Sequence, residues 1–389
     1  MLQLSELSHS LVGQEMFQIL AQAQEMEREG REVLHFEIGE PDFRTPENIS
    51  EAAIAAIQGG DTHYTNSMGL HEFRREAILA TERSRGFRPD LEQILVTPGA
   101  NVQIYLAIAC SVNPGEEVII PDPGFVSYAS IAKSLGAIPV RVKLHEKNGF
   151  RMDPMDVSDL ITPKTRMLIM NSPSNPTGAV ATEEEILQLY ELAMANGIYL
   201  LSDEIYTRMI YNESEVGFCS PSRYDECRTN CILVNGFSKS YAMTGWRLGV
   251  VTGPQALIRK MGLLLETTLS CTSPFIQRAG IEALRGSQKE IEKMVEAYRN
   301  RRDQLIDGLN SIPGFRCSRP GGAFYAFPNI TATGYSSEEL AKRLMFDLGI
   351  IVSPGTIFGK FGEGFIRLCY ATSEQNIERA LDKMDEYFS

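Results

Sequence analysis

Short runs of residues that are apolar on both faces alternate with helical patterns through the middle of this 389-residue chain. Such runs are typical of strands that helices cover on both sides, because each face of the sheet then meets a hydrophobic layer. Six runs have this character: Gln93–Thr97, Glu117–Ile120, Arg166–Asn171, Ile198–Ser202, Cys231–Asn235 and Leu248–Thr252. Thr182 and Glu185 form a capping box that begins a helix between two of them, and Gly197 ends it. The pattern predicts an α/β fold with a mostly parallel central sheet and flanking helices.

The two ends of the chain carry a different pattern. A long amphipathic helix is predicted from about 287 to 310, and short strands follow at Ala323–Phe327, Ile350–Ser353 and Phe365–Tyr370. Capped helices are predicted to begin near Ser336 and Thr372. The first forty residues predict a helix that ends at Gly30 and a strand at Val33–Ile38. We expect both ends to form one smaller α+β unit.

Charge and cysteine content narrow the class of partners and the compartment. With 37 Lys+Arg and 50 Asp+Glu the formal net charge is −13, which repels nucleic acid and anionic lipid surfaces. The 7 cysteines are scattered and form no C-x-x-C pair, so neither a disulfide framework nor a metal site is expected. No signal peptide or membrane span is recognisable. We therefore expect a cytoplasmic protein.

Chemistry-bearing residues follow three of the predicted strands, RMLIMN, IYLLS and CILVN, at the sheet edge where open α/β folds place ligands. The first of these strands runs into SPSNPTG. Lys239 follows the run CILVN; by itself it is either a surface lysine at a helix start or a partly buried nucleophile with a lowered pKa. Ser238 and Arg247 offer a hydroxyl and a guanidinium that suit a phosphate monoester. Asp203 follows IYLLS and is either a helix cap or a recessed carboxylate.

A helix predicted directly after the first strand of the sheet offers an anion site at its N-terminus. Gly99, Ala100 and Asn101 open this helix, and the free N–H groups of a first turn attract anions. The alternative is a tight strand-to-helix turn with no ligand. The segment lacks G-x-G-x-x-G, so it is not a dinucleotide fingerprint.

Taken together, eight motifs in this order resemble those of the class I/II aminotransferases, pyridoxal-phosphate enzymes of fold type I related to aspartate aminotransferase. The motifs are GEPDF (Gly39–Phe43), HYTNSMG (His63–Gly69), PDPGFVSY (Pro121–Tyr128), SNPTG (Ser174–Gly178), SDEIY (Ser202–Tyr206), FSKSYAMTGWRLG (Phe237–Gly249), PGGAFYAF (Pro320–Phe327) and FIRLCYA (Phe365–Ala371). The resemblance covers nearly the whole chain. It implies ping-pong exchange of an amino group between an L-amino acid and a 2-oxo acid, with 2-oxoglutarate as the expected acceptor.

The resemblance also implies the catalytic roles. Lys239 would bind pyridoxal 5′-phosphate covalently and then move the proton between the substrate and the cofactor. Asp203 corresponds to the acid that faces the pyridine nitrogen and keeps it protonated. Tyr206 and Asn175 correspond to the residues that hydrogen-bond the phenolic oxygen of the cofactor.

Binding roles follow in the same way. Ser238, Arg247 and the N–H groups of Ala100 and Asn101 match the phosphate-binding residues, and Phe125 matches the aromatic side chain that stacks on the pyridine ring. Tyr64 matches a tyrosine that reaches the phosphate of the neighbouring subunit, which implies a homodimer with shared active sites.

The substrate-binding residues implied by the resemblance are Gly39, Asn175 and Arg367, with Arg367 binding the α-carboxylate. The Asp122–Pro123 and Asn175–Pro176 bonds lie where the family often has cis peptides. The implied division is a large cofactor-binding domain of residues 45–285 and a small domain of residues 1–44 and 286–389.

Two residues leave the substrate open. Aspartate-specific relatives commonly have tryptophan at the position of Phe125, and one branch has lysine at the position of Asn101. The donor is therefore either aspartate-like or a broader set of neutral and aromatic amino acids. Lyases, decarboxylases, oxidases and synthases of the same fold would keep the same residues. A non-catalytic regulator is disfavoured, because only 38 residues precede Gly39 and the catalytic set is complete.

Overall fold

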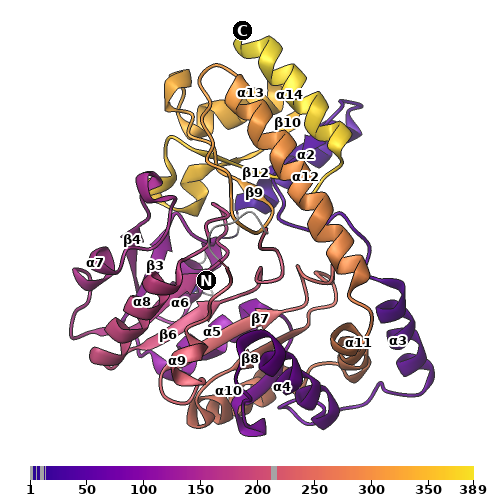
Figure 1. Cartoon of the computed structure of the whole chain (residues 1–389), viewed down its shortest axis with the longest axis vertical. Helices are drawn as coiled ribbons and strands as arrows, with labels where there is room; N and C mark the ends of the chain where they lie inside the picture. The colour runs from indigo at the N-terminus through magenta and orange to yellow at the C-terminus, as the bar shows by residue number, and fades with distance from the viewer. Residues whose placement is uncertain (1–2, 6, 9–12, 14, 212–216) are drawn as a thin grey trace.

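A computed structural model describes residues 3–5, 7–8, 13, 15–211 and 217–389. Its largest sheet has seven strands in the order β2-β8-β7-β6-β5-β3-β4 (Figure 1). The strands are β2 (Ile94–Thr97), β3 (Glu117–Asp122), β4 (Ile138–Lys143), β5 (Thr165–Asn171), β6 (Tyr199–Asp203), β7 (Cys231–Gly236) and β8 (Gly249–Thr252). Strand β8 pairs antiparallel with both β2 and β7, and the other neighbouring strands of this sheet pair in parallel. The predicted α/β fold with a mostly parallel central sheet is confirmed.

Alternating side chains give the sheet two apolar faces. In β5, Met167 and Ile169 join one hydrophobic cluster, and Leu168 and Met170 join another. Helices α5, α6 and α10 pack on the first face, whereas α4, α7, α8 and α9 contact strands from the second. Both faces are covered, which explains the continuous apolar runs in the sequence.

The helices of this part of the molecule surround the sheet and its edges. Their bounds are α3 (Glu47–Gln58), α4 (His71–Arg85), α5 (Ala100–Ser111), α6 (Val126–Ser134), α7 (Pro154–Ser158), α8 (Glu183–Ala195), α9 (Ser222–Asp225), α10 (Gln255–Leu269) and α11 (Pro274–Arg285). The predicted capping box of α8 is present: Thr182 accepts from the N–H of Glu185, and Glu185 accepts from the N–H of Thr182. The helix ends at Ala195, and Gly197 follows with φ +63°.

The upper part of the molecule in Figure 1 is built from a segment near each end of the chain. Its helices are α2 (Glu15–Arg28), α12 (Lys289–Ser311), α13 (Ser337–Leu348) and α14 (Glu374–Phe388). Its strands are β1 (Leu34–His35), β9 (Tyr325–Ala326), β10 (Ile350–Ile351), β11 (Ser353–Pro354) and β12 (Ile366–Cys369). β1 pairs with β10, so a segment near the N-terminus is joined to one near the C-terminus. Helix α12 runs from beside α11 up to α14 (Figure 1).

Some strands and one helix differ from the sequence-based prediction in their presence, length or first residue. The edge strand β4 was not predicted, because Pro139 and two charged side chains interrupt its apolar pattern. The strands of the upper part are shorter than predicted, since they form only small sheets. The last helix has Ser373 as its N-cap, one residue after Thr372.

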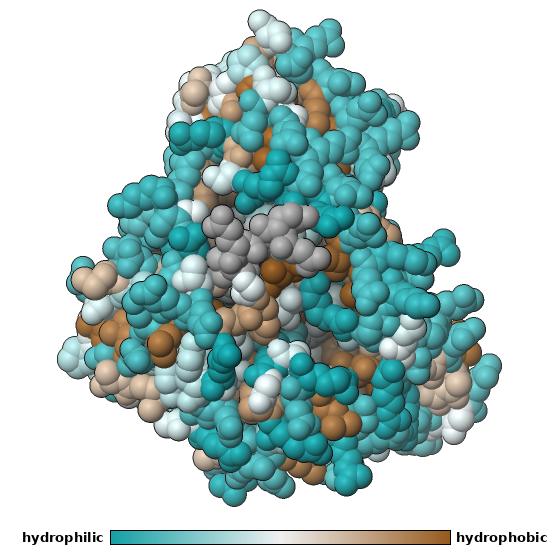
Figure 2. Space-filling view, in the orientation of Figure 1, coloured by the Kyte–Doolittle hydropathy of each residue, from teal (hydrophilic) through white to brown (hydrophobic). Residues whose placement is uncertain are grey.

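In the described part of the chain, no helix is both long and apolar enough to cross a bilayer. Figure 2 shows a mostly hydrophilic face, on which small hydrophobic groups are separated by polar side chains. Such scattered apolar residues are normal at a protein surface.

Candidate active site

A cavity of about 360 Å³ lies at the carboxyl ends of β5, β6 and β7, between the seven-stranded sheet and the upper part of the molecule. Residues from the sheet and from both chain ends line it. The lining residues are Met16, Phe17, Ile38, Gly39, Ala100, Asn101, Phe125, Tyr128, Asn171, Asn175, Asp203, Ile205, Tyr206, Ser238, Lys239, Thr244, Arg247, Tyr325 and Arg367. We call it the front cavity.

Lys239 lies three residues beyond β7, and its side chain is half-buried at the wall of the front cavity. The Nζ atom donates a hydrogen bond to the backbone O of Gly39 at 2.5 Å. Burial disfavours the charged ammonium and lowers its pKa to about 8; the nearby Arg367 and Arg247 act in the same direction. A sizeable fraction of the amine is therefore neutral near pH 8, and the neutral amine is the nucleophilic form.

Asp203 is the last residue of β6, and its carboxylate is 4% exposed. The Tyr128 hydroxyl donates to Oδ2 at 2.7 Å, and the N–H of Ile205 donates to Oδ1 at 3.2 Å. Burial raises the pKa of Asp203 to about 6, although these two hydrogen bonds oppose the rise. A buried carboxylate at a cavity wall is best stabilised by a cationic group of a ligand.

Backbone and side-chain donors gather where α5 begins. Helix α5 starts at Ala100, so its first N–H groups have no partner within the helix. Gly99 has φ +84°, and a Cβ atom there would overlap the guanidinium of Arg247. The side chains of Ser238 and Arg247 line the same cavity. A helix N-terminus, a hydroxyl and a guanidinium together suit a phosphate group.

Arg367 is a fully buried cation on β12. Its Nη1 atom donates to Asn175 Oδ1 at 3.1 Å, and its Nη2 atom donates to the backbone O of Glu37. The guanidinium lies over the ring of Tyr325 with a distance of 4.7 Å to the centroid. Its Nε atom has no hydrogen-bond partner within the described residues. A desolvated guanidinium with unused donor capacity is suited to a carboxylate ligand.

Two tyrosine side chains line the front cavity together with Lys239. The hydroxyl groups of Tyr206 and Tyr325 are 2.6 Å apart, and burial raises the pKa of both phenols. A Cβ atom at Gly39 would overlap the Tyr325 hydroxyl, so only glycine fits there. On the opposite wall Phe125 packs edge-to-face on Tyr128, with ring centroids 5.5 Å apart.

The structure brings eleven of the twelve predicted site residues to this one cavity. They are Gly39, Ala100, Asn101, Phe125, Asn175, Asp203, Tyr206, Ser238, Lys239, Arg247 and Arg367. Tyr64 is not among the lining residues, and its side chain is 89% exposed. Its assignment to a neighbouring subunit stays a prediction. The two expected cis bonds, Asp122–Pro123 and Asn175–Pro176, are present together with a third at Ser172–Pro173.

Sequence reasoning gave no role to several residues of this cavity. Tyr128, Tyr325 and Met16 are the main ones. Tyr128 lies three residues after Phe125, one helical turn along α6, and this spacing was a usable signal. Met16 comes from α2 and places its sulfur 3.2 Å from Arg367 Nη2, across a separation in sequence that no local pattern reveals.

The lining offers no metal site. Within the described residues there is no group of three or more His, Cys, Asp and Glu side chains arranged to hold a metal ion. The cavity instead combines a neutralisable amine, a buried acid and two arginines.

Comparison with known proteins places this arrangement in a family. The model of the family described as aminotransferase class I and II matches residues 31–384. The chain is 41% identical over 360 residues to an aspartate aminotransferase of Pyrococcus horikoshii, covering 91% of this chain and 90% of the relative. It is 39% identical over 357 residues to aromatic-amino-acid aminotransferase 2 of Thermococcus litoralis, covering 91% of each.

A solved structure gives the same result for the fold. Aspartate aminotransferase from Thermus thermophilus with maleate superposes with a TM-score of 0.95 at 35% sequence identity. The match covers 99% of this chain and 100% of that chain.

Proposed function

Since this chain belongs to the class I and II aminotransferases and is a pyridoxal-phosphate-dependent transaminase, we propose that its preferred amino donors are neutral and aromatic L-amino acids. The expected acceptor is a 2-oxo acid, with 2-oxoglutarate as the first candidate. The observation that carries this preference is the composition of the front cavity. Of its described lining residues only Lys239, Arg247 and Arg367 are cationic.

The residues of the front cavity fit the cofactor group by group. Arg247, Ser238 and the first N–H groups of α5 would hold the phosphate, and the buried carboxylate of Asp203 would meet the pyridine nitrogen. Phe125 would pack on the ring, and Asn175 and Tyr206 would donate to its phenolic oxygen. When bound, the cofactor supplies an electron sink for the charge that develops at the substrate Cα.

The protein's own part in the reaction is to hold and move protons. Lys239 provides an amine that burial keeps partly neutral, so it can accept and return a proton beside the substrate Cα. Asp203 provides the negative charge that keeps a proton on the ring nitrogen, and Tyr128 orients this carboxylate. Arg367 would bind the substrate α-carboxylate, so the Cα–H bond is held in a fixed direction.

The lining residues that remain to contact the substrate side chain are mainly apolar. Each of the three lining cations has a proposed partner: the cofactor aldehyde for Lys239, the phosphate for Arg247 and the α-carboxylate for Arg367. Met16, Phe17, Ile38 and Tyr325 are available for the side chain. A second carboxylate, as in aspartate or 2-oxoglutarate, would need a donor from outside these residues, and a second subunit could provide it.

Aspartate is the second candidate donor. It is favoured by the 41% identity to the aspartate aminotransferase of Pyrococcus horikoshii. The two candidates differ in whether a cation outside the described lining binds the side-chain carboxylate.

A donor panel with 2-oxoglutarate tests the proposal. Phenylalanine, tyrosine, leucine, alanine and aspartate are compared by kcat/KM, and the aminated cofactor is followed spectroscopically in each half-reaction. We expect phenylalanine or leucine to exceed aspartate by at least about tenfold, the effect of about 1.4 kcal/mol in transition-state binding. A sharp optimum for aspartate would overturn the preference.

The remaining expectations concern organisation. We infer a homodimer whose subunits share active sites, because the exposed Tyr64 lies outside the front cavity of its own chain. Sedimentation equilibrium tests the dimer, and a monomer with full activity would refute it. We keep the division into a large domain of 45–285 and a small domain of 1–44 and 286–389, and a cytoplasmic location, without nucleic-acid or membrane partners, as parts of this proposal.

A further inference from the structure

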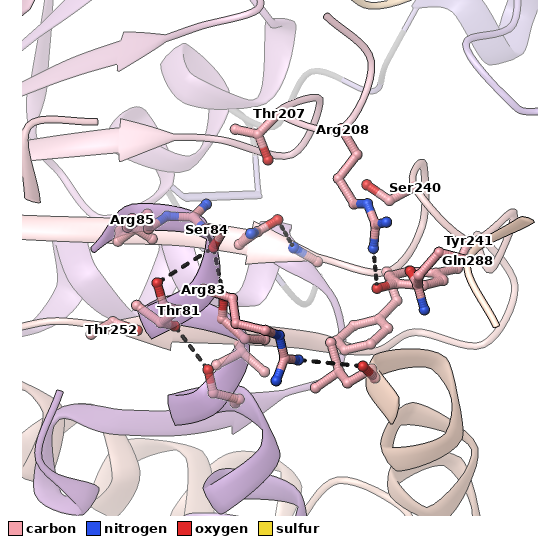
Figure 3. Close-up of a pocket in the computed structure, with 18 residues that line it drawn as sticks. Thr81, Arg83, Ser84, Arg85, Thr207, Arg208, Ser240, Tyr241, Thr252 and Gln288 are labelled. Carbon is pink, nitrogen blue, oxygen red and sulfur yellow. Dashed lines mark hydrogen bonds between the residues drawn. The ribbon is translucent and has the colours of Figure 1, made fainter. Parts of the chain in front are cut away.

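A second cavity, of about 370 Å³, lies over β7 and β8 on the sheet face that α4 covers in part. We call it the back cavity, and Figure 3 shows its side chains. It is lined by Ala77, Ala80, Thr81, Arg83, Ser84, Arg85, Thr207, Arg208, Leu233, Asn235, Gly236, Phe237, Ser240, Tyr241, Val250, Thr252, Leu284 and Gln288. Its volume lies within the range of small-molecule sites, roughly 300–1,000 Å³.

The back cavity shares two walls with the front cavity. In the turn after β6, Ile205 and Tyr206 line the front cavity, whereas Thr207 and Arg208 line the back cavity. In the segment after β7, Ser238 and Lys239 line the front cavity, whereas Phe237, Ser240 and Tyr241 line the back cavity. A ligand in the back cavity would therefore touch the same two backbone segments that carry Tyr206 and Lys239.

The charge of the back cavity is one-sided. Its lining includes Arg83, Arg85 and Arg208 but no Asp, Glu, Lys or His. Arg85 is neutralised: its Nε and Nη2 atoms donate to Glu204 Oε2 at 2.9 and 2.6 Å, and both side chains are buried. The other two guanidinium groups decide the charge of the cavity.

Arg83 and Arg208 have neutral partners. Arg208 donates to the Tyr241 hydroxyl at 2.6 Å and lies over that ring, while Arg83 makes a long hydrogen bond of 3.4 Å to the backbone O of Leu284. Within the described part of the chain, neither takes part in a salt bridge. Figure 3 shows Arg208 extending from its turn toward Tyr241, and Arg83 extending from α4 on the other side. Two cations with no acidic partner among the described residues are notable on one cavity of a chain with a net charge of −13.

The remaining lining is mainly made of apolar and hydroxyl-bearing side chains. Ala77, Leu233, Phe237, Val250 and Leu284 are its large or small apolar members. Hydroxyl groups come from Thr81, Ser84, Thr207, Ser240, Tyr241 and Thr252. A few placed polar groups on a mainly apolar wall are typical of a ligand site. A phosphate ion alone would leave these apolar side chains without a contact.

We propose that the back cavity binds a small organic anion, a carboxylate carried on an apolar body, and that its occupancy alters catalysis at Lys239. The carboxylate would accept hydrogen bonds from Arg83 and Arg208, which carry donors that these neutral partners leave unused. The apolar body would cover Leu233, Phe237 and Val250. Because Arg208 and Tyr241 lie next to the segments that hold Tyr206 and Lys239, the bound anion would change how firmly those segments are held.

The probe is 3-phenylpropionate, a carboxylate that is neither an amino donor nor a 2-oxo acid. Calorimetric titration of the holoenzyme counts its sites, because the probe is also expected to compete with substrate at Arg367. We expect two sites per chain in the wild type and one in the double variant Arg83→Gln/Arg208→Gln. Inorganic phosphate and 3-phenylpropanol are expected to bind the back cavity at least about tenfold more weakly, since each lacks one part of the ligand.

Catalysis is measured at saturating donor and acceptor, where the front cavity is occupied by substrate. We expect the probe to change kcat by at least twofold in the wild type and by less than 1.2-fold in the double variant. Arg75→Gln is the matched control, because Arg75 is an exposed residue of α4 outside the cavity lining, and it should behave like the wild type. The conservative variant Arg208→Lys should retain part of the response.

Three results would overturn the inference. They are one site per chain in the wild type, equal binding by the wild type and the double variant, and an unchanged kcat despite a filled back cavity. Phosphate that binds as tightly as the probe would refute the organic class of the ligand. The titration does not depend on turnover, so a failure of the donor preference proposed above leaves this test intact.

Discussion

The front and back cavities are nearly equal in volume, about 360 and 370 Å³, yet they differ in how their charges are held. The front cavity contains buried charges of both signs, Asp203 and Arg367, beside the half-buried Lys239. Desolvation raises the pKa of Asp203 and lowers that of Lys239. In the back cavity, Arg83 and Arg208 form no salt bridge with any described residue, and both are exposed. Cavity size therefore says little about chemistry, whereas buried charge of both signs marks the site that can move protons.

The two cavities also show how one segment serves two surfaces. Within residues 237–241, Ser238 and Lys239 line the front cavity, whereas Phe237, Ser240 and Tyr241 line the back cavity. This adjacency allows matched substitutions that separate the roles of the two cavities while changing neighbouring positions.

The largest difference is expected between Lys239→Ala and Ser240→Ala. Loss of the amine removes both the covalent attachment and the proton carrier, so kcat should fall by at least about 10⁴-fold. Ser240→Ala removes a hydroxyl that lies outside the front cavity and should stay within threefold of the wild type. Steady-state transamination measures both variants. A Lys239→Ala enzyme with a tenth of normal activity would contradict the assignment of the front cavity.

The next difference concerns the arginines. Arg367→Gln should lower kcat/KM by roughly 10²-fold, because removing one member of a buried charge pair costs about 3 kcal/mol. Arg208→Gln should leave kcat/KM nearly unchanged in the absence of an added anion. The same assay with one amino donor compares the two. Equal losses of kcat/KM in the two variants would contradict the different roles assigned to the buried and the exposed arginine.

A smaller effect is expected at Tyr128. Tyr128→Phe removes a hydrogen bond to a charged group, which is worth about 1.5–3 kcal/mol, and should lower kcat roughly tenfold. That bond holds the pKa of Asp203 down, so its loss raises this pKa further above about 6. Asp203 is needed as a carboxylate, so activity is lost as the pH falls through its pKa.

The acid limb of the pH–rate profile of Tyr128→Phe should therefore move to higher pH. Tyr241→Phe provides the matched control, since it changes a tyrosine of the back cavity. An unmoved acid limb in Tyr128→Phe would show that Tyr128 does not tune Asp203.

Much of the fold could be read from the sequence. The runs around Arg166–Asn171 and Cys231–Asn235 are apolar because helices cover both faces, and the capping box at Thr182 has a purely local cause. The edge strand β4 was missed because a strand with one free side needs less apolar character. The short strands of the upper part depend on pairing between distant segments, such as Leu34 with Ile350, which local patterns do not encode.

The candidate site was predictable to a similar degree. Asp203 ends β6, Lys239 follows β7 and Arg247 precedes β8, all three in recognisable motifs, and the sheet brings them together. The contacts of Met16 with Arg367 depend on tertiary packing of α2, which no motif describes. The back cavity was not predictable at all, because it lies between α4 and the turn at Thr207 and has no sequence signature of its own.

The smallest expected effect is a shift in the pH at which the Lys239 amine loses its proton. Burial lowers the pKa of Lys239 to about 8, so its amine is neutral at a lower pH than an ordinary lysine, whose pKa is about 10.4. In the cofactor-free protein, competitive labelling with acetic anhydride followed by mass spectrometry should give Lys239 a midpoint near pH 8. Exposed lysines of the same sample serve as the reference. A midpoint near that of the exposed lysines would mean that the amine is not desolvated.

The identity of the attachment residue can be tested directly by reducing the holoenzyme with borohydride. The reduction fixes the cofactor to the lysine that holds it, and digestion with mass spectrometry locates the modified residue. We predict one pyridoxyl group per chain, on Lys239, in the peptide that also contains Ser238 and Ser240. A modification on any other lysine would contradict the assignment of the front cavity as the site of the reaction.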